Sequence, residues 1–404
     1  MSATNPLWAS AVLLTERMVQ PMDKPTVQDI FHRFYPAYLD QYSPSPVQAK
    51  AAHNIMNCKT GAYGANVCVC EDCGFVQIHY NSCRNRCCPM CQAVPKEMWM
   101  DARREDVLDA PYFHLVFTVP DILNPVIYSN QRLLYDALYH AASSTISELT
   151  ADPKHLGAKV GYICILHTWG SEMNFHPHIH AILLGGGLAS NNQWKDNGEN
   201  FFLPIRVISK VFRGKYLEEL KRLWKEDKLV FHGTAEKFRN HYTFKELLDS
   251  CYGMDWIPHC KKTFNGAQTV MKYLGKYTHR IAVSNHRIVR MDDDTVTFLV
   301  KDYRNDGQWK ELTISGVEFV RRFLMHVPPR RFVRIRHYGL LCSRTKSQKL
   351  TLCRNLLGCK KYLSKLRDME MPEILEHLYG IKVCVCKACG GHLGKPQMRM
   401  PLRC

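Results

Sequence analysis

Histidines alternate along the segment HPHIHAILL, which spans residues 176–184. If this segment is a strand, His178 and His180 point to one face of a sheet, and Ile179 and Ala181 point to the other. Two imidazoles at positions i and i+2 can present adjacent nitrogens to one cation. Paired histidines on strands are more often ordinary surface or core residues, so the pattern alone is a weak signal. We predict that His178 and His180 bind a metal ion.

A third ligand can come from the preceding strand. Residues 160–169, VGYICILHTW, are typical of a strand, and the polar SEMNFHP that follows predicts a hairpin. His167 lies on this strand and is the predicted third ligand. Glu172 and Gln268 are the alternatives.

Two tyrosines, Tyr273 and Tyr277, lie four residues apart in a predicted helix over residues 266–280. Their hydroxyls then emerge on one face of the helix, about one turn apart. A tyrosine can attack a phosphodiester if a metal ion polarises the phosphate and the helix holds the phenol in line. An aromatic pair packed on a basic surface is the alternative. The same helix carries four basic residues, Lys272, Lys276, His279 and Arg280. Lys272, Lys276 and Arg280 are predicted to contact DNA.

Seven cysteines fall within the 26 residues from 67 to 92. Cys70 and Cys73 form one C-x2-C pair, Cys88 and Cys91 form another, and 14 residues separate the pairs. This spacing is close to that of a four-cysteine zinc ribbon, in which four thiolates enclose the ion. We predict that these four cysteines bind one structural Zn²⁺. Two further cysteines in the block can replace a ligand or serve a second ion, namely Cys83 and Cys87.

The end of the chain holds a second group of ligand residues. It comprises Cys384, Cys386, Cys389, His392 and Cys404. The group can form a second, smaller metal site, although the spacing to its last member is irregular; a flexible tail is the alternative.

The chain of 404 residues is 46% hydrophobic and 23% charged, which excludes wholesale disorder. The chain has 54 Lys and Arg residues but 37 Asp and Glu residues. The resulting net charge of +17 indicates a nucleic-acid partner. Residues 321–367 hold 14 of these basic residues and no acidic one. The predicted DNA contacts in this segment are Arg330, Arg331, Arg334 and Arg336.

No apolar stretch is long enough to span a membrane, and the first twenty residues lack the features of a secretory signal. We therefore expect a cytoplasmic, nucleoid-associated protein in which the eighteen cysteines serve metal ions and not a disulfide framework.

Five segments, specific when taken together, are SCRNRCCPMCQ, FTVP, LHTWGSEMNFHPHIH, KYLGKYTHR and EFVRRFLMHVPPRRFVRIRHYG. Through them the chain, from about residue 30 to 345, resembles the two-tyrosine HUH transposases of bacterial rolling-circle insertion sequences. A histidine–hydrophobic–histidine strand is a recurrent metal site in such nucleases.

The resemblance implies an α+β fold. Its HUH endonuclease core is a central antiparallel sheet flanked by helices, with an N-terminal zinc ribbon-like module and a basic C-terminal region. The expected domains are an N-terminal helical region (1–66), the zinc-binding module (67–95), the nuclease core (96–318, with an insertion at about 188–260) and the basic, DNA-binding C-terminal region with its Cys-rich tail (319–404).

The resemblance also implies a reaction. Tyr273 or Tyr277 attacks single-stranded DNA and leaves a 5′-phosphotyrosine and a free 3′-hydroxyl. His178 and His180 hold the catalytic Mg²⁺ or Mn²⁺. The implied partner is single-stranded DNA at the transposon ends and at the target. Self-association and contacts with host replication factors are further candidates.

Three other classes of protein fit part of the pattern. A rolling-circle replication initiator or relaxase of a mobile element would use the same histidines and tyrosines. The cysteine block before the nuclease and the VRRFLMHVPPRRF block after it favour a transposase. A zinc-dependent DNA-binding regulator would leave the histidines and tyrosines without a role. A zinc hydrolase would need a general base such as the glutamate of H-E-x-x-H, which the chain lacks.

Overall fold

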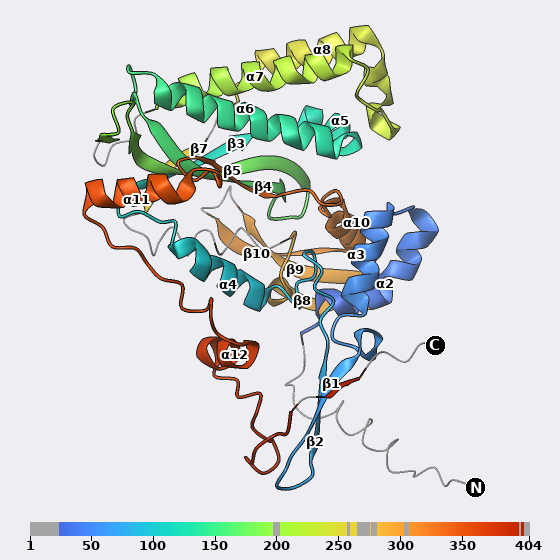
Figure 1. Cartoon of the computed structure of the whole chain (residues 1–404). Helices are drawn as coiled ribbons and strands as arrows, with labels where there is room; N and C mark the ends of the chain where they lie inside the picture. Colours follow the sequence, from blue (N-terminus) through green and yellow to red (C-terminus); the bar gives the residue numbers. More distant parts are fainter. Residues whose placement is uncertain are drawn as a thin grey trace.

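The computed structural model describes residues 24–196, 203–256, 259–264, 275, 281–302, 307–395 and 397–399. Three sheets and the helices around them make up this part of the chain (Figure 1). Within it, no helix combines the length and the apolar character needed to cross a membrane.

A six-stranded antiparallel sheet forms the centre of the molecule (Figure 1). Its strand order is β11-β4-β5-β3-β7, and β6 pairs with the end of β5. β-Branched and aromatic residues dominate the long central strands, as strand propensity favours. The strands are β3 (Tyr112–Thr118), β4 (Lys159–Trp169), β5 (Phe175–Leu188), β6 (Trp194–Asp196), β7 (His259–Phe264) and β11 (Ile335–Gly339).

One face of this sheet is covered by a helical layer (Figure 1). Alternate residues of the strands, such as Leu115, Cys164 and Ile179, are fully buried against it. The segment expected as an insertion contributes the outer helices of this layer, and Phe212 and Trp256 of this segment belong to the same core. The helices are α5 (Asn124–Ser129), α6 (Gln131–Ala151), α7 (Ile205–Lys225) and α8 (His241–Gly253), with short 3-10 turns η2 (Asp121–Leu123) and η3 (Gly233–Arg239).

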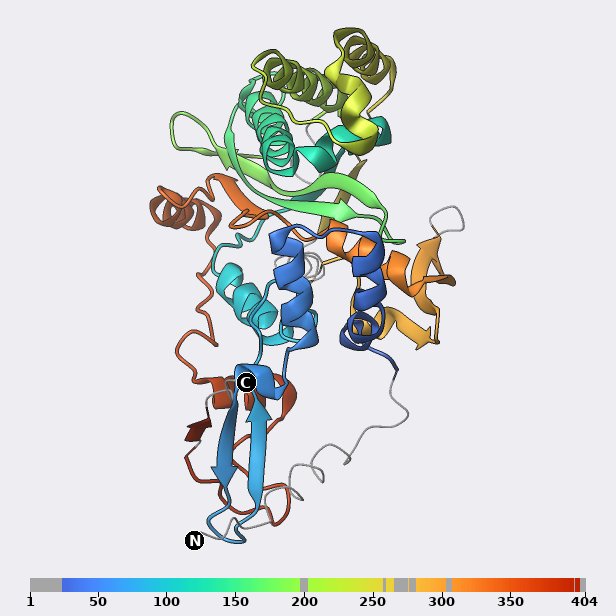
Figure 2. The same cartoon turned by 90° about the vertical axis from the view of Figure 1, so that its right-hand side faces the viewer.

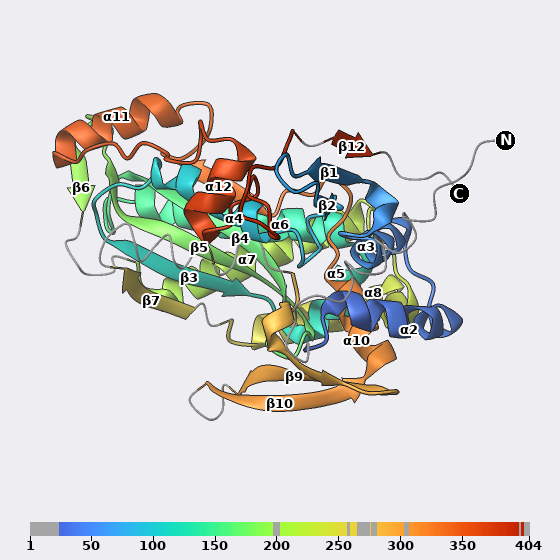
Figure 3. The ribbon, with the colours of Figure 1, turned by 90° about the horizontal axis from the view of Figure 1, so that it is seen from below.

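A second sheet, of order β10-β9-β8, packs with three helices into a separate core beside the central sheet (Figure 3). Thr26 and Ser45 begin two of these helices with capping boxes, and Ser315 caps the third. The elements are α2 (Val27–Gln41), α3 (Pro46–Met56), η4 (Asn285–Arg287), β8 (Ile288–Met291), β9 (Thr295–Asp302), β10 (Gln308–Ser315) and α10 (Gly316–Met325).

A third sheet, of order β12-β1-β2, projects away from the rest of the molecule (Figure 2). It joins a hairpin near the start of the chain to a strand near its end. Its elements are η1 (Gly61–Tyr63), β1 (Ala65–Val69), β2 (Val76–Tyr80) and β12 (Gln397–Arg399). Further helices among the described residues are α4 (Ala93–Arg104), α11 (Lys346–Leu357) and α12 (Met371–Tyr379).

The expected fold class is confirmed, because helices flank a central antiparallel sheet that carries the histidines. The predicted strand at 160–169 and the predicted hairpin are present, and β5 extends the second strand to Phe175–Leu188. The predicted helix over 266–280 lies outside the described residues, apart from Gly275.

Candidate active site and zinc centres

The histidine cluster lies on the hairpin formed by β4 and β5. His167 of β4 pairs with His178 of β5 in the sheet register, and His180 follows two residues further along β5. All three side chains are buried, on the face opposite the helical layer. Their ligand nitrogens lie within 4.8 Å of one another. The structure thus brings together the three histidines that the sequence singled out.

The ring nitrogens of His178 and His180 face each other. The two Nε2 atoms are 3.0 Å apart. His178 Nδ1 donates to the carbonyl oxygen of His176 at 2.7 Å, so its Nε2 keeps a lone pair. Two nitrogens at right angles around an ion, each at ~2.1 Å, would be about 3.0 Å apart. The residues present therefore fit a divalent ion between the two imidazoles.

A fourth histidine, His114 of β3, supports this pair from the neighbouring strand. Its Nε2 lies 2.8 Å from Nδ1 of His180, and the two rings are stacked. When His180 donates from Nδ1 to His114, its Nε2 lone pair turns toward His178. Sequence reasoning missed His114, because only the pairing of β3 with β5 brings it to His180.

Burial sets the protonation state of the two central histidines. It lowers the pKa of His178 to about 4, with the neighbouring His176 adding to the effect. Burial also lowers the pKa of His180 well below its usual value, with His167 contributing. Both imidazoles are therefore neutral at neutral pH, which is the form that binds a metal ion.

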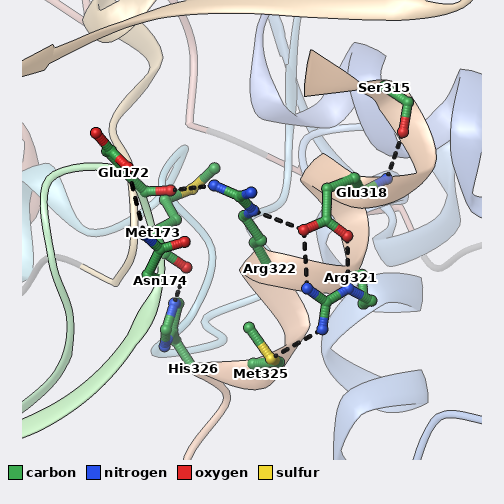
Figure 4. Close-up of polar contacts among 9 residues, drawn as sticks. All are labelled: Glu172, Met173, Asn174, Ser315, Glu318, Arg321, Arg322, Met325 and His326. Atoms are coloured by element: carbon green, nitrogen blue, oxygen red, sulfur yellow. Dashed lines mark hydrogen bonds and ion pairs between the residues drawn. The ribbon is translucent and has the colours of Figure 1, made fainter. Parts of the chain in front are cut away.

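Helix α10 holds the turn between β4 and β5 in place (Figure 4). Arg322 donates to the carbonyl oxygen of Glu172 at 2.9 Å, and Glu318 pairs with Arg322. His326, which follows the helix, donates from Nε2 to the carbonyl oxygen of Met173 at 2.9 Å. The EFVRRFLMH segment therefore positions the histidine hairpin.

The two alternatives for a third ligand differ in position. The Glu172 carboxylate accepts a hydrogen bond from Asn174 in the turn, and it is not part of the histidine cluster. Gln268 lies outside the described residues.

The predicted nucleophiles Tyr273 and Tyr277 lie outside the described residues, as do Lys272, Lys276 and Arg280. Gly275, between the two tyrosines, is described and lies directly against the side chain of Met100 in α4. Met100 packs on the apolar cluster that includes Ile165 and Ile182, on the same sheet face as the histidines.

The four cysteines predicted to bind one zinc ion fall into two separate clusters. Cys88 and Cys91 lie with Cys58 and Cys83. Cys70 and Cys73 lie instead with two cysteines near the end of the chain, Cys386 and Cys389. The prediction of a single site from both C-x2-C pairs is therefore wrong. The first pair sits at the tip of the β1–β2 hairpin, and the strands carry this tip away from the second pair.

The cluster of Cys58, Cys83, Cys88 and Cys91 has the chemistry of a closed zinc site. Its four Sγ atoms lie within 4.8 Å of one another, and those of Cys83 and Cys91 are 3.8 Å apart. Zinc–sulfur bonds of ~2.3 Å put the thiolates of a tetrahedron about 3.8 Å apart. Hydrogen bonds with Cys83 and Cys88 hold the pKa of Cys91 well below its usual value. Cys87 is buried beside this cluster without belonging to it.

The four predicted arginines of the C-terminal region differ in their surroundings. Arg330 and Arg331 are exposed. The guanidinium carbon of Arg334 lies 5.9 Å from the centre of the Trp169 ring, and this ring stacks on His167 of the cluster. Arg336 makes its contacts within the protein.

Arg336 pairs with Asp136, and its guanidinium lies 3.9 Å from the centre of the Tyr139 ring. Further basic residues of segment 321–367 pair internally, including Lys346 with Asp106 and Arg367 with Glu105. Part of the local positive charge therefore stabilises the fold and is not free for DNA.

Two solved structures with a partly similar fold are a conjugative relaxase, TrwC, in complex with oriT DNA, in metal-free and metal-bound forms. Each has a TM-score of 0.24 and 14% sequence identity to this chain. The alignments cover 41% of this chain and 71% and 69% of those chains.

Sequence comparisons give a family. A model described as a putative transposase matches residues 161–349, and a transposase zinc-binding domain matches residues 30–119. The putative transposase y4qJ of Sinorhizobium fredii (strain NBRC 101917 / NGR234) is 40% identical over 90% of this chain and 93% of its own length. The transposase for insertion sequence element IS801 of Pseudomonas savastanoi pv. phaseolicola is 30% identical over 75% of this chain and 72% of its own length. The chain belongs to this family of two-tyrosine transposases of rolling-circle insertion sequences, with an N-terminal zinc-binding domain.

Proposed function

We propose that this transposase cuts and rejoins single-stranded DNA through a 5′-phosphotyrosine intermediate, with the help of a divalent ion at the histidine cluster. The observation that carries the proposal is the facing pair of Nε2 atoms, 3.0 Å apart, on His178 and His180. Each ring is fixed through its Nδ1 atom, by the His176 carbonyl oxygen and by His114. Such outer contacts orient histidines that bind metal ions.

His178 and His180 are the proposed ligands, with His167 as the third. When bound, Mg²⁺ or Mn²⁺ would polarise the scissile phosphate and offset the negative charge that develops on it. Trp169 and Arg334 border the cluster beside His167. A guanidinium there suits a phosphate oxygen of the bound strand, because arginine matches phosphate geometry well.

Tyr273 and Tyr277 are the proposed nucleophiles. The contact of Gly275 with Met100 supports this role, because Gly275 is two residues from each tyrosine and Met100 packs on the sheet face that carries the histidines. The phenol loses its proton and its oxygen attacks phosphorus. The bond from phosphorus to the 3′-oxygen breaks, the 3′-oxygen takes up a proton, and the 5′-phosphate stays on tyrosine. The covalent bond keeps the energy of the phosphodiester, so rejoining needs no ATP.

The proposal is tested by incubating the full chain with labelled single-stranded DNA from the element ends and Mn²⁺. We expect a protein–DNA adduct that survives denaturation and is labelled only when the label lies on the 3′ side of the cut. The absence of any adduct with end sequences, under conditions where the DNA is bound, would overturn the proposal.

A matched set of variants connects the adduct with the histidine cluster. His178→Ala with His180→Ala should abolish the adduct and leave DNA binding largely intact. His176→Ala is the control, because it keeps the backbone carbonyl oxygen that accepts from His178 and removes a side chain that pairs with Asp121. Full adduct formation by the double variant at saturating Mn²⁺ would show that the histidine cluster has no role in the reaction.

A further inference from the structure

Two Cys-x2-Cys-Gly segments near opposite ends of the chain adopt the same turn. In the first, the Gly74 amide donates to the carbonyl oxygen of Cys70 at 3.0 Å, and Gly74 has φ +69°. In the second, the Gly390 amide donates to the carbonyl oxygen of Cys386 at 3.0 Å, with φ +76°. Glycine fits this left-handed position without strain. This turn directs both cysteines of a pair to one side.

The two pairs face each other and bring four thiols together. All four Sγ atoms lie within 4.8 Å of one another. Cys70 and Cys389 are 3.5 Å apart at sulfur, and Cys73 and Cys386 are 3.7 Å apart. These separations match the edges of a tetrahedron built on zinc–sulfur bonds of ~2.3 Å, about 3.8 Å. They are far from the ~2.0 Å of a disulfide bond.

Backbone amides add the hydrogen bonds that thiolates need. The amides of Ala388 and Gly391 point to the sulfurs of Cys386 and Cys389, each at 3.4 Å. Such donors favour the charged form of an acceptor and so support ligation.

Strand pairing brings the second turn onto the first. Cys70 forms a bridge with Leu393, and the Gly394 amide donates to the carbonyl oxygen of Val69 at 2.9 Å. The Glu71 amide donates to the carbonyl oxygen of His392 at 3.1 Å. Beyond these contacts, β12 pairs with β1, so the last strand completes the sheet of the hairpin (Figure 2).

The apolar core of this third sheet is too small to hold it together. Its buried cluster consists of Cys68, Cys70, Cys386 and Leu393, and two of these are members of the thiol group. Modules with so few buried side chains are usually stabilised by disulfides or by metal ions. The thiol geometry favours a metal ion.

We propose that Cys70, Cys73, Cys386 and Cys389 bind a second structural Zn²⁺, which fastens the C-terminal segment to the N-terminal hairpin. The matched family regions, residues 30–119 and 161–349, both end before Cys386. The site is separate from the cluster of Cys58, Cys83, Cys88 and Cys91. It is a zinc ribbon assembled from two distant parts of the chain, in which Cys73 and Cys386 are 313 positions apart in the sequence.

Zinc content measures the site directly. Cys386→Ser with Cys389→Ser should lower the zinc bound per chain by one equivalent relative to the unmodified protein. The matched control is Cys342→Ser with Cys359→Ser, because neither residue belongs to a cluster, and its zinc content should not change. Unchanged zinc in the first variant would overturn the proposal.

A second experiment keeps all four cysteines, since a serine variant can also fail to fold. A protease site is inserted between Gly380 and Ile381, which are both exposed, and the purified chain is cut there. We expect the fragment after residue 380 to stay bound until a zinc chelator is added, under reducing conditions throughout. In the background of Cys386→Ser with Cys389→Ser, it should separate without chelator.

Two results of the cleavage experiment would contradict the site. A fragment that separates from the unmodified cysteines before chelation is not held by zinc. A fragment that stays bound after chelation is held by strand pairing and not by zinc.

Discussion

Nε2 of His326 donates a hydrogen bond of 2.9 Å to the carbonyl oxygen of Met173, in the turn that joins the two histidine strands. A carbonyl oxygen can only accept, so Nδ1 of His326 is left to accept from the Thr168 hydroxyl at 3.1 Å. The bond accepted at Nδ1 requires the neutral imidazole, because a protonated Nδ1 has no lone pair. A residue far along the chain thereby fixes the tip of the histidine hairpin.

This contact predicts a dependence of stability on pH. Burial lowers the pKa of His326 to about 4, against about 6.5 when unfolded. Its contribution is therefore fully present above pH 6.5 and is lost as the pH falls toward 4. His326→Gln keeps a donor and an acceptor but does not titrate. Between pH 7 and pH 4.5, the free energy of unfolding should fall by roughly 2–3 kcal/mol more for the native chain than for the variant. Denaturant titrations at the two pH values measure this, and equal losses would contradict it.

The contact between His114 and His180 predicts a defect in metal binding. His114→Ala should raise the Mn²⁺ concentration needed for half-maximal DNA cleavage by about 10- to 100-fold, because His180 loses the partner of its Nδ1 atom. Cleavage at saturating Mn²⁺ should be largely restored, and His114→Gln should restore part of the affinity. A loss of maximal cleavage with unchanged Mn²⁺ dependence would show a different role.

The two tyrosines should act in sequence. One ion cannot hold two scissile phosphates in line at once, so Tyr273→Phe and Tyr277→Phe should each retain some single cleavage and each fail in complete strand transfer. The double variant should form no adduct. Tyr242→Phe, at an exposed tyrosine of α8, is the control and should be silent. Complete strand transfer by either single variant would contradict a mechanism with two nucleophiles.

The arginines of the C-terminal region should separate into two groups. Arg330→Ala with Arg331→Ala should weaken binding of single-stranded DNA at all sequences and lower the salt slope by ~0.7 for each lost phosphate contact. Arg336→Ala should leave that slope unchanged and lower the free energy of unfolding by about 1–2 kcal/mol, because it loses Asp136 and the Tyr139 ring. Salt titrations of DNA binding distinguish the groups. An unchanged slope in the first variant would mean that these arginines face elsewhere.

The cluster around Cys88 predicts which cysteines of the zinc-binding domain are ligands. Cys58→Ser should remove one zinc ion per chain and destabilise the fold, as Cys88→Ser should, because the site is closed by four thiolates. Cys87→Ser should keep its zinc, since Cys87 is outside the cluster. Zinc analysis of the three variants tests this assignment. If only Cys87→Ser lost zinc, the assignment of Cys58 and Cys88 as ligands would be contradicted.

The sequence by itself determined the histidine site, for a local reason. Side chains on a strand alternate with period two, so the placement of His178 and His180 on one face needed no knowledge of the rest of the fold. The polar turn before them was enough to predict the hairpin that brings in His167. The family motifs were sufficient to recognise a transposase with a zinc-binding domain.

Only the tertiary structure decided how distant residues combine. Both C-x2-C pairs of the cysteine block have the same local pattern. Spacing therefore did not reveal that the first pair clusters with Cys386 and Cys389, while the second clusters with Cys58 and Cys83. Strand pairing between the two ends of the chain makes that choice. The same holds for Arg336, whose charge is visible in the sequence. Its ion pair with Asp136 and its contact with the Tyr139 ring depend on segments about 200 residues apart.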